Sequence, residues 1–568
     1  MTRDFRGPGS SRQASRRREP TFERQAPSAR RVLGMAALVL VVVASGAFVV
    51  GAVVTGAEQP PIPDLAVGAS PSTSPGGLGV GGPISSADPS ASTDPSAEAD
   101  QSPELLPPGE VAWVPVVGFW STTNAISEQA IGAALSGGSV KYKAVMVPAD
   151  DVAAIEEALG VTISGSVGRG TPDEVRAAVK AGALGILRAS DVTPGVRALG
   201  IGKQQLFGIS RTDSLDTWPL RGEVEDPAPW DQARTWTLVA GGDILLDRGV
   251  ALTVRSKKAG VDFPYDGGSA SIVRETCCNA TYRTKTPVTQ RDSRGGAFRS
   301  YLESADIALA NLESPVDDQF AYHSRGTVFS GDPKLLEGVE NAGFDVLSLA
   351  NNHIRDAGTD GIMETVKALK ARGIASTGAG KGFANARKPA VLETHGVTVA
   401  IFGCDAIARR YWSSGSAIGS RGCDRTTLVA DIKKAKDSSD VVIVFPHWGI
   451  EYRANPSASQ RRLAKAWAKA GADLVIGNHA HWAAAMEAVG EVPVWYALGN
   501  LVFDQTWSTK TMEGITLELT FEGERLRQIR IRPHLILDKA QPNFMDPTGD
   551  GAAVLKQVRD ASKKLWPY

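Results

Sequence analysis

Metal-binding residue types recur directly after short apolar stretches of this chain. Four of its seven histidines do so, together with acidic and amide side chains. Imidazole, carboxylate and amide donors together favour Zn, Mn or Fe over Ca or Mg. We therefore expect a site for a divalent ion, and the alternative is a buried hydrogen-bond network. The candidate metal ligands are Asp243, Glu313, Asn352, His447, His479 and His481.

The apolar stretches before these residues predict the strands that position them. Continuous apolar runs are typical of strands buried on both faces. Helical patterns occur between several of them, at 361–372, 428–435 and 459–470. Ligands of α/β sheets bind at the carboxyl ends of the strands, so we expect the strand ends to meet at one site. The predicted strands are 236–240, 307–310, 346–350, 441–445, 474–476 and 494–498.

Six motifs carry a resemblance to a known family. They are LVAGGD (238–243), ANLESPV (310–316), SLANNHIRDAG (348–358), HWGIEY (447–452), GADLVIGNHAHW (471–482) and YALGNLVFD (496–504). Their order and spacing resemble the CapA family, which is linked to poly-γ-glutamate capsule synthesis and related to calcineurin-like metallophosphoesterases. The resemblance extends from about residue 234 to about residue 538. It implies an α/β fold, namely a metallophosphatase-like β-sandwich flanked by helices, with a two-metal centre at the strand ends.

The resemblance also implies roles for single residues. Asp243 matches the first aspartate ligand, and Glu313 stands where a bridging aspartate is usual. His353 matches a histidine that protonates the leaving group, with Asp356 as its orienting partner or as a plain structural cap. The remaining ligands are Asn352, His447, His479 and His481, and the expected supporting residues are Asn351, Glu451, Tyr452 and Asn500.

Two departures from the phosphoesterase pattern bear on the metal site. Leu245 occupies a position where that family usually has a histidine, and the bridging carboxylate is Glu313 rather than an aspartate. One of two metal sites should therefore be weaker, or a single ion should bind.

The resemblance implies a metallophosphoesterase-like, metal-dependent hydrolase or transferase in poly-γ-glutamate or other surface-polymer biosynthesis. Its expected partners are an anionic polymer or a phosphorylated substrate, and other capsule-synthesis membrane proteins. The alternative is a non-catalytic factor that binds or exports an anionic surface polymer. A net charge of −1 argues against nucleic acid as a partner.

The N-terminal region predicts a membrane anchor. Residues 1–31 hold nine arginines against three acids, and residues 32–54 hold no charge. That apolar stretch can cross a hydrocarbon layer of about 30 Å as a helix. The arginines place the N-terminus in the cytoplasm and the folded domains outside the cell membrane. A cleaved signal peptide is the alternative interpretation.

The rest of the chain divides by composition. Residues 55–109 are rich in Pro, Ser, Gly and Ala and predict a disordered linker. Residues 110–226 alternate strand-like and helix-like stretches, as in a small α/β domain of unknown role, which could itself recognise a ligand. The CapA-type domain follows at 234–538, and 539–568 is a C-terminal extension.

Four cysteines, Cys277, Cys278, Cys404 and Cys423, are candidates for disulfide bonds. Outside the cell they can form up to two disulfides, in any of three pairings. A cysteine metal site is a weaker alternative because no CxxC spacing occurs.

Overall fold

The computed structural model describes residues 109–138, 141–227, 230–293 and 295–568, which all fall in one compact unit of the chain, 99–568. The predicted basic tail (1–31), membrane helix (32–54) and linker (55–109, apart from its last residue) lie outside the described residues. Among the residues that the structure describes, no helix has the length and apolarity needed to span a membrane.

Residues 109–224 form an α/β lobe with its own sheet and its own core, in the region where the sequence predicts a small α/β domain. The sheet order is β4 (Gly168–Gly170), β3 (Val145–Pro148), β5 (Leu184–Arg188), β1 (Gly109–Gly118) and β6 (Val196–Ala198), and β8 (Arg221–Val224) also pairs with β1. Its helices are α2 (Glu128–Leu135), α3 (Val152–Leu159) and α4 (Pro172–Lys180).

Helix α4 begins where its sequence predicts. The side chain of Thr171 accepts a hydrogen bond from the Glu174 N–H, and the Glu174 carboxylate accepts one from the Thr171 N–H. These reciprocal bonds form a capping box, with proline at the first helical position. Val175 and Val179 then turn inward into the core of the lobe.

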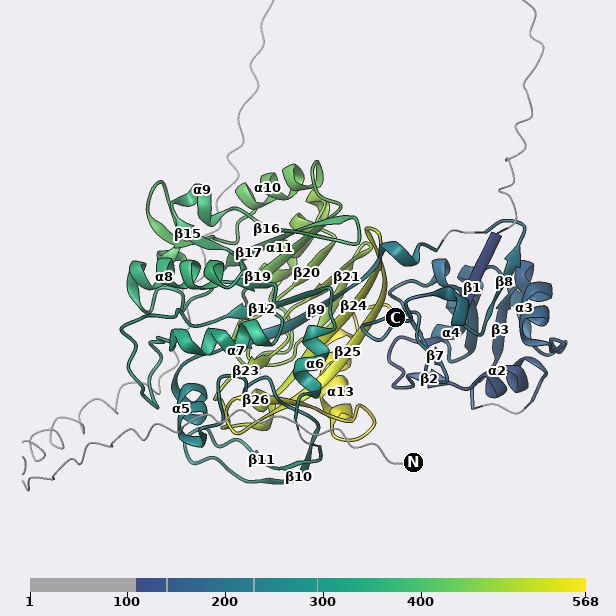
Figure 1. Ribbon diagram of the computed structural model, residues 1–568, viewed down its shortest axis with the longest axis horizontal. Coiled ribbons are helices and arrows are strands. Elements are labelled where there is room, and N and C mark those ends of the chain that lie inside the picture. Colours follow the sequence, from purple (N-terminus) through teal and green to yellow (C-terminus); the bar gives the residue numbers. More distant parts are fainter. Residues whose placement is uncertain (1–108, 139–140, 228–229, 294) are drawn as a thin grey trace, which may run out of the picture. The chain divides into compact units, whose positions relative to one another are not determined.

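The larger part of the chain contains two sheets of mixed direction (Figure 1). The eight-stranded sheet has the order β14 (Ala375–Thr377), β13 (Val346–Ser348), β12 (Ile307–Leu312), β9 (Thr235–Ile244), β24 (Glu513–Glu522), β25 (Arg525–Leu537) and β26 (Gln541–Phe544), with β23 (Asn500–Val502) also paired to β9. Strands β14, β13, β12 and β9 are parallel, and β24, β25 and β26 continue antiparallel.

The second sheet has six strands, of which the middle four are parallel. Its order is β16 (Ala390–Thr394), β17 (Val397–Asp405), β19 (Val441–His447), β20 (Leu474–Ile476), β22 (Val492–Trp495) and β21 (Met486–Val489). The short apolar stretches of the sequence are thus the central strands of two sheets.

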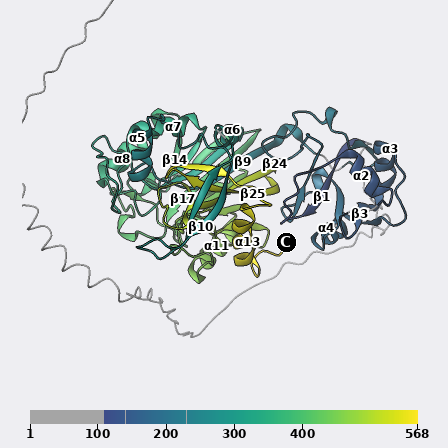
Figure 2. The ribbon, with the colours of Figure 1, turned by 90° about the horizontal axis from the view of Figure 1, so that it is seen from below.

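One hydrophobic cluster joins the inner faces of the two sheets, with Leu238 and Leu517 from the first and Ile443 and Leu474 from the second. Figure 2 shows α5 (Arg248–Lys257), α7 (Leu336–Asn341) and α8 (Gly358–Ala371) on one side and α11 (Ala458–Ala470) on the other. Helices therefore cover the outer faces of a sheet pair, and the predicted α/β class is confirmed.

Residues 539–568 pack with the sheets that precede them. Strand β26 extends the first sheet, and helix α13 (Gly551–Ser562) contacts β21 of one sheet and β25 of the other. Val554, Val558 and Trp566 are buried in the cluster between the sheets. The C-terminal segment thus closes part of the main core.

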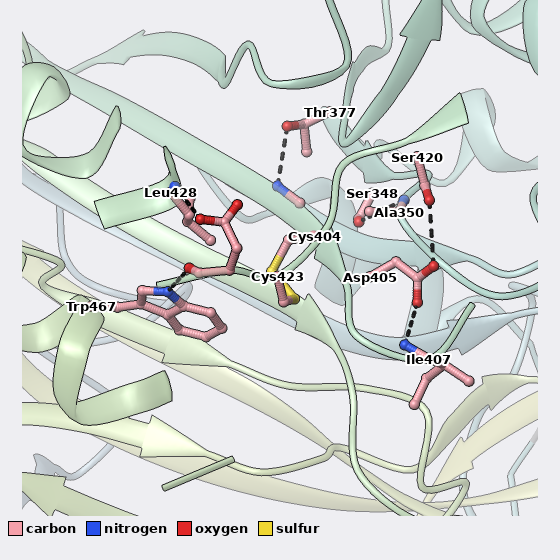
Figure 3. Close-up of a disulfide and its surroundings, with 12 residues drawn as sticks. Ser348, Ala350, Thr377, Cys404, Asp405, Ile407, Ser420, Cys423, Leu428 and Trp467 are labelled. Carbon is pink, nitrogen blue, oxygen red and sulfur yellow. Dashed lines mark hydrogen bonds between the residues drawn. A yellow bond between two sulfur atoms is a disulfide. The ribbon is translucent and has the colours of Figure 1, made fainter. Parts of the chain in front are cut away.

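Cys404, near the end of β17, forms a disulfide with Cys423, with 2.09 Å between the sulfurs and 4.9 Å between the Cα atoms (Figure 3). Cys277 and Cys278 are bonded to each other. Asp405 accepts hydrogen bonds from the Ile407 N–H and the Ser420 hydroxyl. The Cys404–Cys423 disulfide and these bonds fix the loop that follows β17.

Candidate metal centre

The predicted ligands meet at one edge of the paired sheets. Asp243 is the next-to-last residue of β9, Glu313 follows β12, and His447 is the last residue of β19. Asn352 lies in the turn after β13, and His479 and His481 lie in the loop after β20. The carboxyl ends of parallel strands thus deliver side chains from both sheets to a common centre.

Two groups of these side chains are close enough to hold a cation. In the first, ligand atoms of Glu313, His447 and His479 lie within 4.8 Å of one another, and in the second the same holds for Asp243, Glu313 and His481. His447 Nε2 is 3.5 Å from Glu313 Oε1 and 2.8 Å from the Asn352 amide oxygen. The structure therefore brings all six predicted ligands together, and Glu313 is common to both groups.

Glu313 itself shows that a cation fits this centre. The residue is fully buried, and neither of its carboxylate oxygens has a hydrogen-bond partner among the described residues. A buried carboxylate without donors is strongly unfavourable, and a divalent ion removes that cost. The mixed nitrogen and oxygen donors suit Mn, Zn or Fe.

Burial dominates the electrostatics of the centre. It raises the pKa of Asp243 well above its ordinary value, with the neighbouring Glu313 charge as the second cause, and it raises the pKa of Glu313 to about 8. Burial also lowers the pKa of His447 and His479 well below the ordinary value and that of His481 to about 3. The three imidazoles are therefore neutral at pH 7, the form that binds a metal ion.

Amide side chains orient the ligands. The Asn311 amide donates to Asp243 Oδ1 at 2.8 Å, and the Asn351 amide donates to the Leu312 carbonyl at 2.7 Å. Asn500 Oδ1 lies 2.8 Å from Nδ1 of His481. Asn351 and Asn500 thus lie beside the metal ligands, as expected for residues that support them. Asn311 was missed as a site residue, although it ends the same apolar stretch as Glu313 and could have been found there.

His353 lies beside the centre and belongs to neither ligand group. Its Nδ1 is 2.7 Å from Asp356 Oδ2, and that oxygen also accepts the Phe329 N–H at 2.9 Å. The Phe329 ring stacks on the imidazole with 4.1 Å between ring centres. Asp356 and Phe329 therefore fix the imidazole orientation and leave Nε2 available to a substrate.

Leu245 does not contribute to the centre. It is fully buried in a small apolar cluster with Phe329, Phe503 and Ile536. The position where phosphoesterases usually supply a histidine is therefore apolar here. The expectation that one of two metal positions is weaker, or that a single ion binds, stays a prediction.

Close backbone approach and left-handed residues shape the ligand loops. A Cβ on Gly242 would lie 1.8 Å from the Gly499 carbonyl oxygen, so only glycine lets Asp243 and Asn500 come side by side. His479 and His481 have φ values of 90° and 54°. Non-glycine residues rarely adopt such values, and those that do concentrate at functional sites.

Glu451 and Tyr452 follow β19 and occupy the rim of the centre. Glu451 is exposed, whereas Tyr452 is half-buried with its ring stacked near His481 at 6.0 Å. The Tyr452 N–H donates to the Ala480 carbonyl at 2.8 Å. Tyr452 therefore supports the ligand loop, and Glu451 borders the approach to it.

Comparisons with known proteins point to one family. Residues 237–505 match the family model described as bacterial capsule synthesis protein PGA_cap. The PGA biosynthesis protein CapA of Bacillus subtilis (strain 168) is 29% identical over 269 residues, covering 47% of this chain and 70% of that protein. A structure of a putative 5'-nucleotidase from Staphylococcus aureus, 14% identical, overlaps 57% of this chain and 58% of that one with a TM-score of 0.33.

The capsule biosynthesis protein CapA of Bacillus anthracis is 30% identical over an alignment of 361 residues that covers 62% of this chain. The match covers 80% of the B. anthracis protein, so the similarity extends well beyond the metal ligands. The six motifs fall within the part of the chain that carries the metal centre. On this similarity, the chain belongs to the bacterial capsule synthesis protein family, PGA_cap, which includes the CapA proteins.

Proposed function

We propose that this protein is a metal-dependent hydrolase or transferase in the biosynthesis of poly-γ-glutamate or a related surface polymer. The observation that carries the proposal is Glu313, a buried carboxylate common to two groups of ligands and without a hydrogen-bond donor in the described part of the chain. The similarity to CapA proteins supports the pathway, and the centre supports the chemistry.

Different residues would have different roles in such a reaction. Asp243 and Glu313 would balance the charge of one or two ions of Mn, Zn or Fe. The other metal ligands would be His447, His479, His481 and Asn352. A bound divalent ion supplies a Lewis acid and lowers the pKa of a water molecule. His353, oriented through Asp356, would donate a proton to the leaving group.

We further propose that the folded part works outside the cell membrane, anchored through residues 32–54. The Cys404–Cys423 disulfide supports this location because disulfides persist in oxidising compartments. The substrate would be an anionic polymer or a phosphorylated precursor, and other capsule-synthesis membrane proteins would be neighbours.

A second candidate function, binding or export of an anionic polymer without catalysis, is favoured by one observation. Leu245 and its apolar neighbours leave one metal position without the histidine found in phosphoesterases. A single weakly held ion could organise a binding site without activating water.

The test combines metal analysis with turnover. The purified protein should contain Mn, Zn or Fe and hydrolyse bis-p-nitrophenyl phosphate, p-nitrophenyl phosphate or a γ-glutamyl peptide. His447→Ala and Asp243→Ala should lose at least a hundredfold in rate, whereas His395→Ala, a partly exposed histidine outside the centre, should not. Metal-loaded protein that turns over none of these substrates would favour the binding and export role.

A further inference from the structure

Four aromatic side chains extend outward from the metal ligand His481. We call this set, Tyr282, Tyr452, Trp482 and Trp507, the aromatic wall. The Tyr452 ring centre lies 6.0 Å from that of His481 and 5.0 Å from that of Trp507. Tyr282 stacks on Trp507 at 4.4 Å with the rings 28° apart, and Trp482 lies 6.2 Å from Tyr452. Continuous ring contacts therefore lead from the candidate metal centre to the surface.

Hydrogen bonds between distant segments hold the aromatic wall in place. Tyr282 is carried by the hairpin of β10 (Ala270–Thr276) and β11 (Thr286–Arg291). The Thr284 hydroxyl donates to the Trp507 carbonyl at 2.5 Å, and the Thr509 N–H donates to the Lys285 carbonyl at 3.1 Å. The Thr509 hydroxyl also donates to the Glu275 carboxylate at 2.7 Å. The fold thus fixes Tyr282 against Trp507.

The aromatic wall is more exposed than the core tryptophans of the same domain. Trp236, Trp448 and Trp495 are fully buried. Tyr282 is 55% exposed, and the other three members are half-buried. Exposed aromatic rings give up the free energy that burial would provide, and a set of them beside a reactive centre is typical of a ligand surface.

The polar groups around the aromatic wall indicate the ligand. Glu451 adjoins Tyr452 in sequence, Gln505 lies two residues before Trp507, and the Lys510 ammonium lies 4.5 Å from the Trp482 ring centre. Charged side chains of both signs and an amide are thus near the rings. A neutral group with many hydroxyls can use carboxylate, amide and ammonium partners together.

We propose that the aromatic wall is a subsite for a sugar ring of the substrate, next to the group that reacts at the metal centre. The inference rests on the proposed function for its position in the reaction. The C–H face of a pyranose ring carries partial positive charge and packs on the negative face of an aromatic ring. Tyr282 stacks on Trp507 and is still 55% exposed, so part of its ring stays open to a sugar ring.

Direct binding tests the subsite without any turnover. The full chain, loaded with Mn²⁺, is titrated by calorimetry with chitotetraose and cellotetraose, and in parallel with AMP and tetra-γ-glutamate. We expect at least one tetrasaccharide to bind, and Tyr282→Ala and Trp507→Ala to weaken it about tenfold, a loss of about 1.4 kcal/mol. Tyr568→Ala removes another exposed tyrosine, which lies outside the wall, and the variant should bind as the wild type does.

The outcomes separate this inference from the proposed function. If neither tetrasaccharide binds, or if the wall variants bind as the wild type does, the sugar subsite is wrong. The same follows if only AMP or tetra-γ-glutamate binds in a wall-dependent way. Hydrolysis of bis-p-nitrophenyl phosphate without sugar binding would overturn the subsite alone. Wall-dependent sugar binding by a metal-loaded but inactive protein would support the subsite and overturn only the proposed catalysis.

Discussion

Two buried carboxylates, Asp151 in the N-terminal lobe and Glu313 in the metal centre, differ in what surrounds them. Asp151 is 1% exposed and accepts hydrogen bonds from the Trp113 indole N–H at 2.7 Å and from the Arg188 guanidinium at 2.6 Å and 2.9 Å. Glu313 is equally buried, and in the described part of the chain its oxygens have no donor. The two carboxylates are thus equally buried, but only Asp151 has hydrogen-bond donors among the described residues.

The difference teaches how to separate a structural acid from a functional one. The positive partner of Asp151 is part of the fold, so the ion pair needs nothing from solution. The carboxylate of Glu313 faces neutral imidazoles instead, and its natural partner is a cation from solution. Each of the following predictions changes one buried acid and asks whether its partner is a side chain or an ion.

The largest effect should come from Asp151→Asn. Loss of the carboxylate charge leaves the Arg188 guanidinium, whose side chain is 15% exposed, without its counter-ion. Breaking a buried pair from one side costs about 4 kcal/mol of unfolding free energy, measurable by urea unfolding. The metal content should not change. Asp150→Asn, on the exposed neighbour, should stay within about 0.5 kcal/mol of the wild type, and equal losses in both variants would refute this account.

The sequence predicts the elements around Glu313 better than it predicts the contrast with Asp151. Apolar stretches that end in polar residues locate β9, β12, β13, β19 and β20, because buried strands leave a local pattern. The six ligands follow from the same pattern and from the motifs. Local signals of this kind also position helix α4 through its capping box.

The remaining features depend on pairings between distant segments. The donors to Asp151 come from residues 38 positions before it and 37 positions after it. Similarly, β24 lies beside β9 although most of the domain separates them in sequence, and Tyr282 meets Trp507 across 225 positions (507 − 282). No local pattern encodes such contacts, so the aromatic wall became recognisable only in the folded chain.

A third buried acid, Glu513, should show an intermediate effect that depends on pH. Burial, followed by the Glu275 charge, raises its pKa to about 7 from an ordinary 4.5, with Lys510 opposing and Asp550 adding to the shift. The folded state therefore holds the proton more tightly. The resulting stability is fully present below pH 4.5 and is lost as the pH rises through about 7.

Glu513→Gln should remove this pH dependence. Between pH 4.5 and pH 8 the unfolding free energy of the wild type should fall by up to about 3 kcal/mol more than that of the variant. Urea unfolding at the two pH values measures the difference. Glu524→Gln, at an exposed position, should retain the wild-type slope. Parallel pH profiles for wild type and Glu513→Gln would mean that a side chain already neutralises Glu513.

The smallest change in stability, and the sharpest contrast with Asp151, should come from Glu313→Gln. In protein stripped of metal by EDTA at pH 7, burial raises the pKa of the Glu313 carboxyl to about 8, so folding costs the free energy of protonating it. The substitution removes that cost, and the unfolding free energy should rise by about 2 kcal/mol. Added Mn²⁺ should stabilise the wild type and leave the variant unchanged, since an ion stabilises only the state that binds it. Glu518→Gln is the matched control, because Glu518 is 1% exposed and paired with Arg530 at 3.1 Å. It should lose stability with or without Mn²⁺. If Glu313→Gln instead weakens the metal-free protein as Glu518→Gln does, Glu313 has a partner within the fold, and the case for a cation at this centre fails.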